Sequence, residues 1–153
     1  MQSPKLDAMA QARKLISGGG TAALSVLDVE GGTPFTTLVN VAADARLRPL
    51  LLISSLAHHS KCLNADARAS LMLNEKIAPE GDPMLTFRVS LLGRFERVSA
   101  SEAEQHFLTR HPYAELYAGL GDFQCWRMDA REAHIIAGFG RAYGVRFKDL
   151  LES

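Results

Sequence analysis

The residues best suited to chemistry lie where a buried strand gives way to a short helix. Residues 54–61 read SSLAHHSK and offer three serines, two histidines and a lysine as hydrogen-bond donors. A helix start also presents unpaired N–H groups and a partial positive charge, so the segment could hold a phosphate. The alternative, an ordinary serine cap before a solvated polar face, is slightly favoured by the residues alone.

Two further segments could contact a ligand. Arg88 lies on the polar face of the most regular strand pattern in the chain. Such an arginine is usually just exposed, but the outer face of a small barrel can meet a partner, and Arg88 could then reach a ligand between subunits. Residues 138–144 are rich in glycine, which allows close approach to a ligand. They do not form a GxGxxG motif, and the pattern favours a flexible exit from a barrel.

Metal and nucleophile chemistry are not predicted. His58 and His59 are adjacent, so they point in different directions on a helix, and His106 and His111 lack partners at ligand spacing. The sequence contains no HExxH motif, Cys/His quartet or GxSxG motif. We therefore expect no metal site, and the residues single out no catalytic group.

Composition places the chain among ordinary globular domains. Its 153 residues are 47% hydrophobic and 22% charged, and 17 basic residues balance 17 acidic ones. This neutrality argues against nucleic acid and anionic membranes as partners. No secretory signal or membrane span is recognisable. Because Cys62 and Cys125 are far apart and form no CxxC, we expect two reduced thiols and a cytoplasmic protein.

The elements that must position these residues are mostly strands. Apolar residues at helical spacing predict a helix within residues 1–20. Extended patterns predict strands at residues 21–29, 35–43, 49–53, 69–74 and 85–98, and a final pair, or one long bent strand, over 123–139. A short helix is expected within 54–67, and a helix capped by Ser101 with Glu104 follows the fifth strand. Residues 139–153 are expected to form a C-terminal tail.

Hairpin-linked strands with few crossover helices favour an antiparallel barrel over a doubly wound sheet. The predicted fold class is therefore mainly β with flanking helices. No repeat or low-complexity segment divides the chain. We expect a single domain over residues 1–153.

Several runs resemble the pyridoxamine 5′-phosphate oxidase superfamily. The resemblance rests on RVSLLGRFERV at residues 88–98, on the capped helix and RHP that follow it, and on the helix within 54–67. Other runs are similar to the bacterial haem-utilisation branch of that superfamily: RPLLL at 48–52, HSK at 59–61, YAGLGDF at 117–123 and GFGRA at 138–142. Together they cover nearly the whole chain.

The resemblance implies a six-stranded antiparallel split β-barrel that works as a homodimer, with FMN bound in clefts between the subunits. By motif match, one group of residues would hold the phosphate and ribityl oxygens: Ser54, Ser55, His59, Ser60 and Lys61. A second group, Thr37, Leu38 and Val39, would present backbone to the isoalloxazine edge, and Arg88 would reach the flavin. The dimer surface is expected near Phe95 and Trp126.

The function implied is that of an FMN-dependent oxidoreductase with a small-molecule redox substrate. The oxidases proper carry an Arg-x-x-Leu-Leu-Lys run on the second strand, whereas residues 36–41 here read TTLVNV and carry no charge. Pyridoxamine phosphate oxidation is therefore not expected. Two alternatives remain open, namely a haem-binding or haem-degrading protein with haem as the ligand, and a flavin-free dimeric interaction module.

Overall fold

A computed structural model describes residues 3–99 and 101–153. Along the chain its elements are α1 (Pro4–Gly18), β1 (Gly20–Leu27), β2 (Pro34–Ala43), β3 (Pro49–Ser54), α2 (His58–Ala65), β4 (Arg68–Asn74), a 3-10 turn (Pro83–Leu85), β5 (Arg88–Val98), α3 (Ser101–Arg110), a 3-10 turn (Pro112–Ala114), α4 (Glu115–Ala118), β6 (Phe123–Ile136), β7 (Ala142–Arg146) and α5 (Phe147–Glu152).

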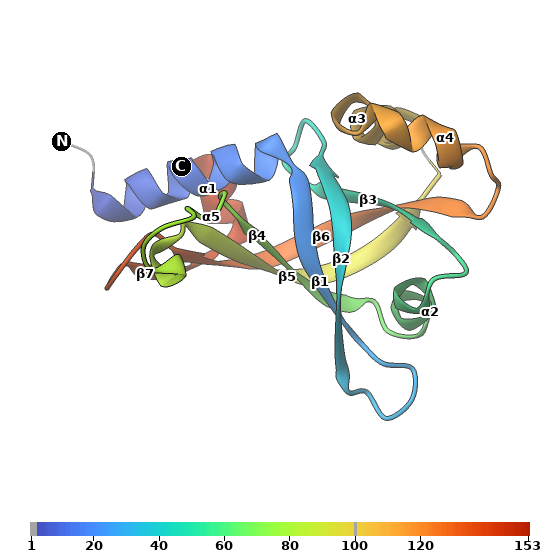
Figure 1. Ribbon diagram of the computed structural model, residues 1–153, viewed down its shortest axis with the longest axis horizontal. Coiled ribbons are helices and arrows are strands. Elements are labelled where there is room, and N and C mark those ends of the chain that lie inside the picture. The colour runs from blue at the N-terminus through green and yellow to red at the C-terminus, as the bar shows by residue number, and fades with distance from the viewer. Residues whose placement is uncertain (1–2, 100) are drawn as a thin grey trace.

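Six strands form a closed antiparallel barrel in the order β3-β2-β1-β4-β5-β6. The barrel closes where β3 pairs with β6, with Leu50 opposite Arg127 and Ser54 opposite Phe123. A seventh strand, β7, pairs with the C-terminal part of β6, from Glu132 to Ile136. Figure 1 shows α1 running along one side of the barrel, with α2 and the α3–α4 pair toward the other end. The predicted six-stranded split barrel is confirmed, and β7 is added to it.

The barrel interior is filled by alternate residues of the strands. Leu24 and Val26 of β1 and Val89 and Leu91 of β5 are at most 2% exposed. Because successive side chains of a strand point to opposite faces, the residues between them face outward. Helices α1 and α5 add apolar side chains to the same core. The interior is therefore a packed core, and ligand sites must lie outside it.

A second apolar cluster lies outside the barrel, beneath α3. It joins Phe107 of α3 to Leu50 of β3 and Cys125 of β6. His111 follows α3 and is almost completely buried; its Nε2 donates to the Val41 carbonyl of β2 at 2.8 Å. Since a carbonyl oxygen only accepts, Nδ1 of the neutral ring accepts from the Tyr113 hydroxyl at 2.9 Å. This histidine ties the α3 region to the barrel.

The long strands differ from expectation at their ends. The predicted strand over 85–98 begins at Arg88, because Asp82 and Pro83 start a 3-10 turn that ends at Leu85. Ser101, the predicted N-cap, is instead the first residue of α3. The final strand is one long strand, β6, and its register against β5 shifts between Leu92 and Gly93 so that Arg131 is an extra, unpaired residue. Such a bulge bends a strand.

Two sequence predictions are wrong. Phe95 and Trp126 are each 3% exposed and belong to the barrel core, so they cannot form the dimer surface. Residues 139–153 are not a tail, since they contain β7 and α5, and α5 buries Phe147 and Leu150. The alternation of inward and outward positions in β5 and β6 explains the first result, and the helical spacing of Phe147 and Leu150 explains the second. Both cysteines are free, as expected, and both are buried. No helix in the described residues is long and apolar enough to cross a membrane.

Replacing Gly93 with alanine is expected to destabilise the fold. A Cβ at this position would lie 2.1 Å from the Asp129 carbonyl oxygen, which is backbone and cannot move aside cheaply. Overpacking of this kind costs about 1–3 kcal/mol or more. Gly18→Ala is the control, because a Cβ there meets nothing within 4 Å. In a denaturant titration, we expect the unfolding midpoint to be lower for Gly93→Ala and unchanged for Gly18→Ala. An unchanged midpoint for Gly93→Ala would show that β5 and β6 can separate at the bulge.

Protonation of His111 is expected to weaken the fold. Burial lowers the pKa of His111, nearby Arg110 adds to this effect, and the hydrogen bond to Val41 opposes it. The unfolded histidine therefore binds a proton more readily than the folded one. Its contribution to stability is complete above the ordinary pKa of about 6.5 and is lost as pH falls below it.

The measurement is the free energy of unfolding at about pH 8 and about pH 5. His111→Gln should lose the part of the pH dependence that this residue supplies, whereas His106→Gln, on the partly exposed side of α3, should keep the wild-type dependence. Equal slopes for wild type and His111→Gln would show that another group causes the acid sensitivity.

Candidate functional site

The serine-rich corner is a closed hydrogen-bonded turn. Ser54 ends β3, and its hydroxyl donates to Asp122 Oδ2 at 2.7 Å while accepting the Leu56 N–H at 3.1 Å. The fully buried Ser60 hydroxyl donates to the Ser54 carbonyl at 2.6 Å. The Ser55 N–H donates to the Asp122 carbonyl at 2.7 Å. Two of the hydroxyls expected to meet a phosphate therefore already have protein partners.

The helix that follows starts later than a serine cap requires. Its N-cap is Ala57, which has no side chain that could accept a hydrogen bond. The alternative of an ordinary serine cap is therefore wrong, and the Ala57 N–H donates to the Ser54 carbonyl at 3.1 Å. Asp122 also places a carboxylate at this corner, where it would repel a phosphate. The assignment of the FMN phosphate to this corner stays a prediction.

His59 and Lys61 differ in what they can offer an anion. His59 is half-buried, and burial together with the neighbouring His58 lowers its pKa, so its ring is neutral at pH 7. Its Nε2 is buried and has no hydrogen-bond partner within the described residues. Lys61 is exposed on α2. Of the predicted phosphate contacts, Lys61 is the available cation.

The remaining predicted residues lie elsewhere on the barrel. On β2, Val39 is buried and Thr37 partly buried, whereas Leu38 points outward and is 74% exposed. Alternate residues of β2 therefore point to opposite faces of the barrel wall. Arg88 begins β5 and donates to the carbonyls of Met84 and Thr86 in its own loop.

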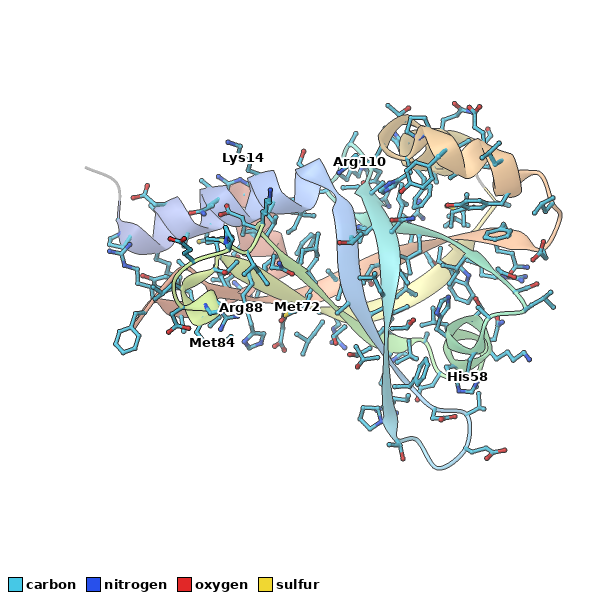
Figure 2. The ribbon with its side chains drawn as sticks, in the orientation of Figure 1. Lys14, His58, Met72, Met84, Arg88 and Arg110 are labelled. Carbon is cyan, nitrogen blue, oxygen red and sulfur yellow. The ribbon has the colours of Figure 1, made fainter. Side chains whose placement is uncertain are left out.

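One chain does not bring Arg88 to the serine corner. Arg88 pairs with Asn74, six residues along β4 from Arg68, which follows α2 closely. At about 3.3 Å per residue these ends of β4 are roughly 20 Å apart. Figure 2 shows Arg88 beside Met84 and far from His58 on α2. A single site containing both Arg88 and residues 54–61 would need a second chain.

A groove on the outer face of the barrel, which we call the arginine groove, is the main candidate site. It has a volume of about 730 Å³ and crosses strands β1 and β4–β7. Paired positions on the five strands form a row along its floor, namely Ser25, Ser70, Leu92, Glu132 and Arg146. Val26, Leu27 and Pro34 add apolar lining. Four strand spacings correspond to roughly 19 Å, enough for a large planar ligand.

Four arginines and one glutamate line this groove: Arg68, Arg94, Arg131, Arg146 and Glu132. Arg68 and Arg94 are direct cross-strand partners on the outer face, an arrangement that is unfavourable for like charges. The positive charge of Arg68 is partly compensated by Asp66. Hydrogen bonds from Arg68 lower the pKa of Asp66 to about 2. Within the described residues, Arg94 and Arg131 form no ion pair. The groove is therefore suited to an anion.

Sequence reasoning missed this groove. Each arginine is an ordinary exposed residue in its own strand, and only the register of β4, β5 and β6 brings Arg68, Arg94 and Arg131 to one place. Arg131 also depends on the bulge, which puts it and Glu132 on the same outer side of β6. One indication of the groove was present in the sequence, namely that Arg94 falls on an outward-facing position of the regular strand over residues 85–98.

A polar cluster at α2 was also missed. Asp28, His58 and Cys62 have potential metal-binding atoms that all lie within 4.8 Å of one another. The spacing of His58 and Cys62, four residues apart on a helix, was visible in the sequence. Asp28 lies in the hairpin between β1 and β2, so its place beside them could not be read from the sequence.

Known proteins with similar sequences or structures fall into two groups. The chain is 28% identical over 148 residues to the chloroplastic non-canonical heme oxygenase HOZ of Arabidopsis thaliana; the match covers 93% of this chain and 44% of HOZ. A heme binding protein from Mycobacterium smegmatis has a TM-score of 0.88 and 25% identity, over 99% of this chain and 62% of that one. The chain thus spans less than two thirds of either relative.

The second group shares the fold alone. A protein from Clostridium acetobutylicum related to general stress protein 26, of the pyridoxinephosphate oxidase family, has a TM-score of 0.70 at 11% identity, over 94% of this chain and 97% of that chain. The predicted resemblance to oxidase-like split barrels and to haem-utilisation proteins is confirmed. The family model for the CREG β-barrel matches residues 3–151, so this chain belongs to the CREG β-barrel family.

Proposed function

We propose that this protein binds haem in the arginine groove. The observation that carries the proposal is the cross-strand pair Arg68–Arg94, with Arg131 in the same groove, where Glu132 is the one acidic lining residue in the described part of the chain. Haem combines an apolar ring with two carboxylates. Arginine pairs with carboxylates through two parallel hydrogen bonds, so Arg94 and Arg131 would hold the propionates.

The groove also fits the ring of a haem. Its volume of about 730 Å³ lies within the usual range for cofactor sites, and the exposed Leu92 supplies apolar contact.

Haem binding is supported by the relatives as well as by the groove. HOZ is named a heme oxygenase, and the Mycobacterium smegmatis protein a heme binding protein. A bound haem supplies one-electron and oxygen chemistry, so haem degradation is the activity that this proposal extends to. The protein residues would hold the propionates, orient the ring and limit water at its face.

A homodimer is part of the proposal. Leu38 of β2 and Met72 of β4 both pair with Ala23, so they flank it on the outer face, where they are 74% and 38% exposed. Leu92 is 39% exposed and also lines the groove. A second copy covering this patch would bury apolar surface and close the open side of the groove.

FMN is the second candidate, as the cofactor of an oxidoreductase acting on a small molecule. It also combines a planar ring with an anion. Lys61 is exposed on α2, and Arg88 lies on a different part of the barrel, so a dimer could bring both to one flavin. This site would differ from the arginine groove, and the two candidates can therefore be separated by mutation.

Replacing Arg94 with alanine is expected to weaken haem binding by about ten- to a hundredfold, the loss typical of a charge-assisted hydrogen-bonded contact. The measurement is the Soret absorbance during haem titration of wild type, Arg94→Ala and Arg88→Ala. Arg88→Ala is the matched control, because it lies on the same strand outside the groove. FMN absorbance is titrated in parallel.

The two candidates predict opposite patterns. Haem affinity lost in Arg94→Ala and kept in Arg88→Ala supports the arginine groove. If Arg88→Ala and Lys61→Ala lose FMN affinity, and the Soret band does not shift with wild type, FMN rather than haem is the cofactor. Wild type that binds neither cofactor would leave the dimeric interaction module as the function.

The dimer is tested by placing a charge in the apolar patch. Leu38→Arg is expected to convert a dimer to a monomer in sedimentation experiments at micromolar concentration, because a buried unpaired charge is costly at an interface. Leu116→Arg is the control, since Leu116 is 84% exposed on α4, away from this patch. A wild-type protein that sediments as a stable monomer would contradict the proposed dimer.

A further inference from the structure

Three side chains of different types meet between the β1–β2 hairpin and helix α2. Asp28 directly follows β1, while His58 and Cys62 lie one turn apart on α2. One oxygen, one nitrogen and one sulfur atom from these residues lie within 4.8 Å of one another. Helix residues four apart share a face, so both α2 side chains point toward Asp28.

Each of the three groups is held in place. The Asp28 backbone pairs with Thr33 and Gly32 across the hairpin, and Asp28 Oδ1 accepts the Glu30 N–H at 3.2 Å. The His58 ring packs edge-on against Phe35, with ring centroids 5.0 Å apart. Cys62 is fully buried in the barrel core. The cluster is therefore fixed from the hairpin on one side and from the core on the other.

The distance between two of the groups suits a metal ion. His58 Nε2 and Asp28 Oδ1 are 3.4 Å apart, long for a hydrogen bond. Two ligands of a tetrahedral zinc ion, each bound at about 2.0–2.2 Å, lie roughly 3.4 Å apart. Thiolate, imidazole and carboxylate are all zinc ligands, and the combination of sulfur and nitrogen donors disfavours magnesium and calcium.

We propose that Asp28, His58 and Cys62 form a Zn²⁺ site with a fourth position open to water. The thiol proton of Cys62 leaves to solvent when the thiolate binds the ion. The partly exposed side chains of Asp28 and His58 give the ion a path from solvent. The bound ion would fasten the hairpin to α2, and its residues are separate from those of the arginine groove.

A Cys-His-Asp nucleophile is the competing explanation for the same three residues. That chemistry needs a thiolate which a substrate can reach. Cys62 is 0% exposed and lies within the core cluster, so a substrate carbon could not approach its sulfur. A single ion needs only to reach the point where the three ligand atoms converge.

The test uses the full chain, stripped of metal with a chelator and titrated with Co²⁺. Cobalt bound to a thiolate gives a charge-transfer absorption in the near ultraviolet. We expect one Co²⁺ per chain with this absorption, loss of the absorption in Cys62→Ser, and binding about ten- to a hundredfold weaker in Asp28→Asn. Added Zn²⁺ should displace the cobalt and raise the melting temperature of wild type.

Matched controls separate the site from general metal binding. Cys125→Ser changes the other buried free cysteine, and His59→Gln changes the histidine next to His58; both should bind as wild type does. Asp28→Asn alters only a hairpin side chain, so it keeps the test valid if Cys62→Ser fails to fold. No charge-transfer absorption in wild type, or equal Co²⁺ affinity in wild type and Asp28→Asn, would overturn the proposal.

Discussion

The pairing of β3 with β6 is the interaction on which the rest of the structure depends. Residues 50–54 meet residues 123–127 and close the sheet, so every barrel strand has a neighbour on both sides. Closure divides each strand into an inner and an outer set of side chains. The inner set is a packed core containing Trp126 and Phe95, and this packing leaves recognition of ligands to the outer face.

The outer face is used differently on its two sides. Over β3 and the first half of β6 it is covered by α3, with Phe107 packed on Leu50 and Cys125. Over β2, β1, β4 and β5 it carries the arginine groove and the exposed Leu38 and Met72. Figure 1 shows the same separation, with α3 and α4 at the opposite end of the molecule from β7. The uncovered side is the one suited to a ligand and a second chain.

Local patterns in the sequence were enough to predict the barrel. The alternation in β5, with Val89 and Leu91 inward and Arg94 outward, and the glycines after α1 are local signals that tertiary structure left unchanged. The candidate sites were harder, because they depend on which strands are neighbours. The serine corner looked like a helix cap, but the Ser54 hydroxyl donates instead to Asp122, 68 residues away in the sequence. No local pattern could indicate that partner.

The bulge at Arg131 has a consequence for how this face can evolve. One additional residue in β6 resets which side chains point inward, so Arg131 and Glu132 both face outward while Ala133 and Ile135 return to the core. Residues around the bulge are thus released from the strict alternation that governs the other strands. Related chains could exchange the charges at these two positions and so accept different anions, without repacking a single core residue.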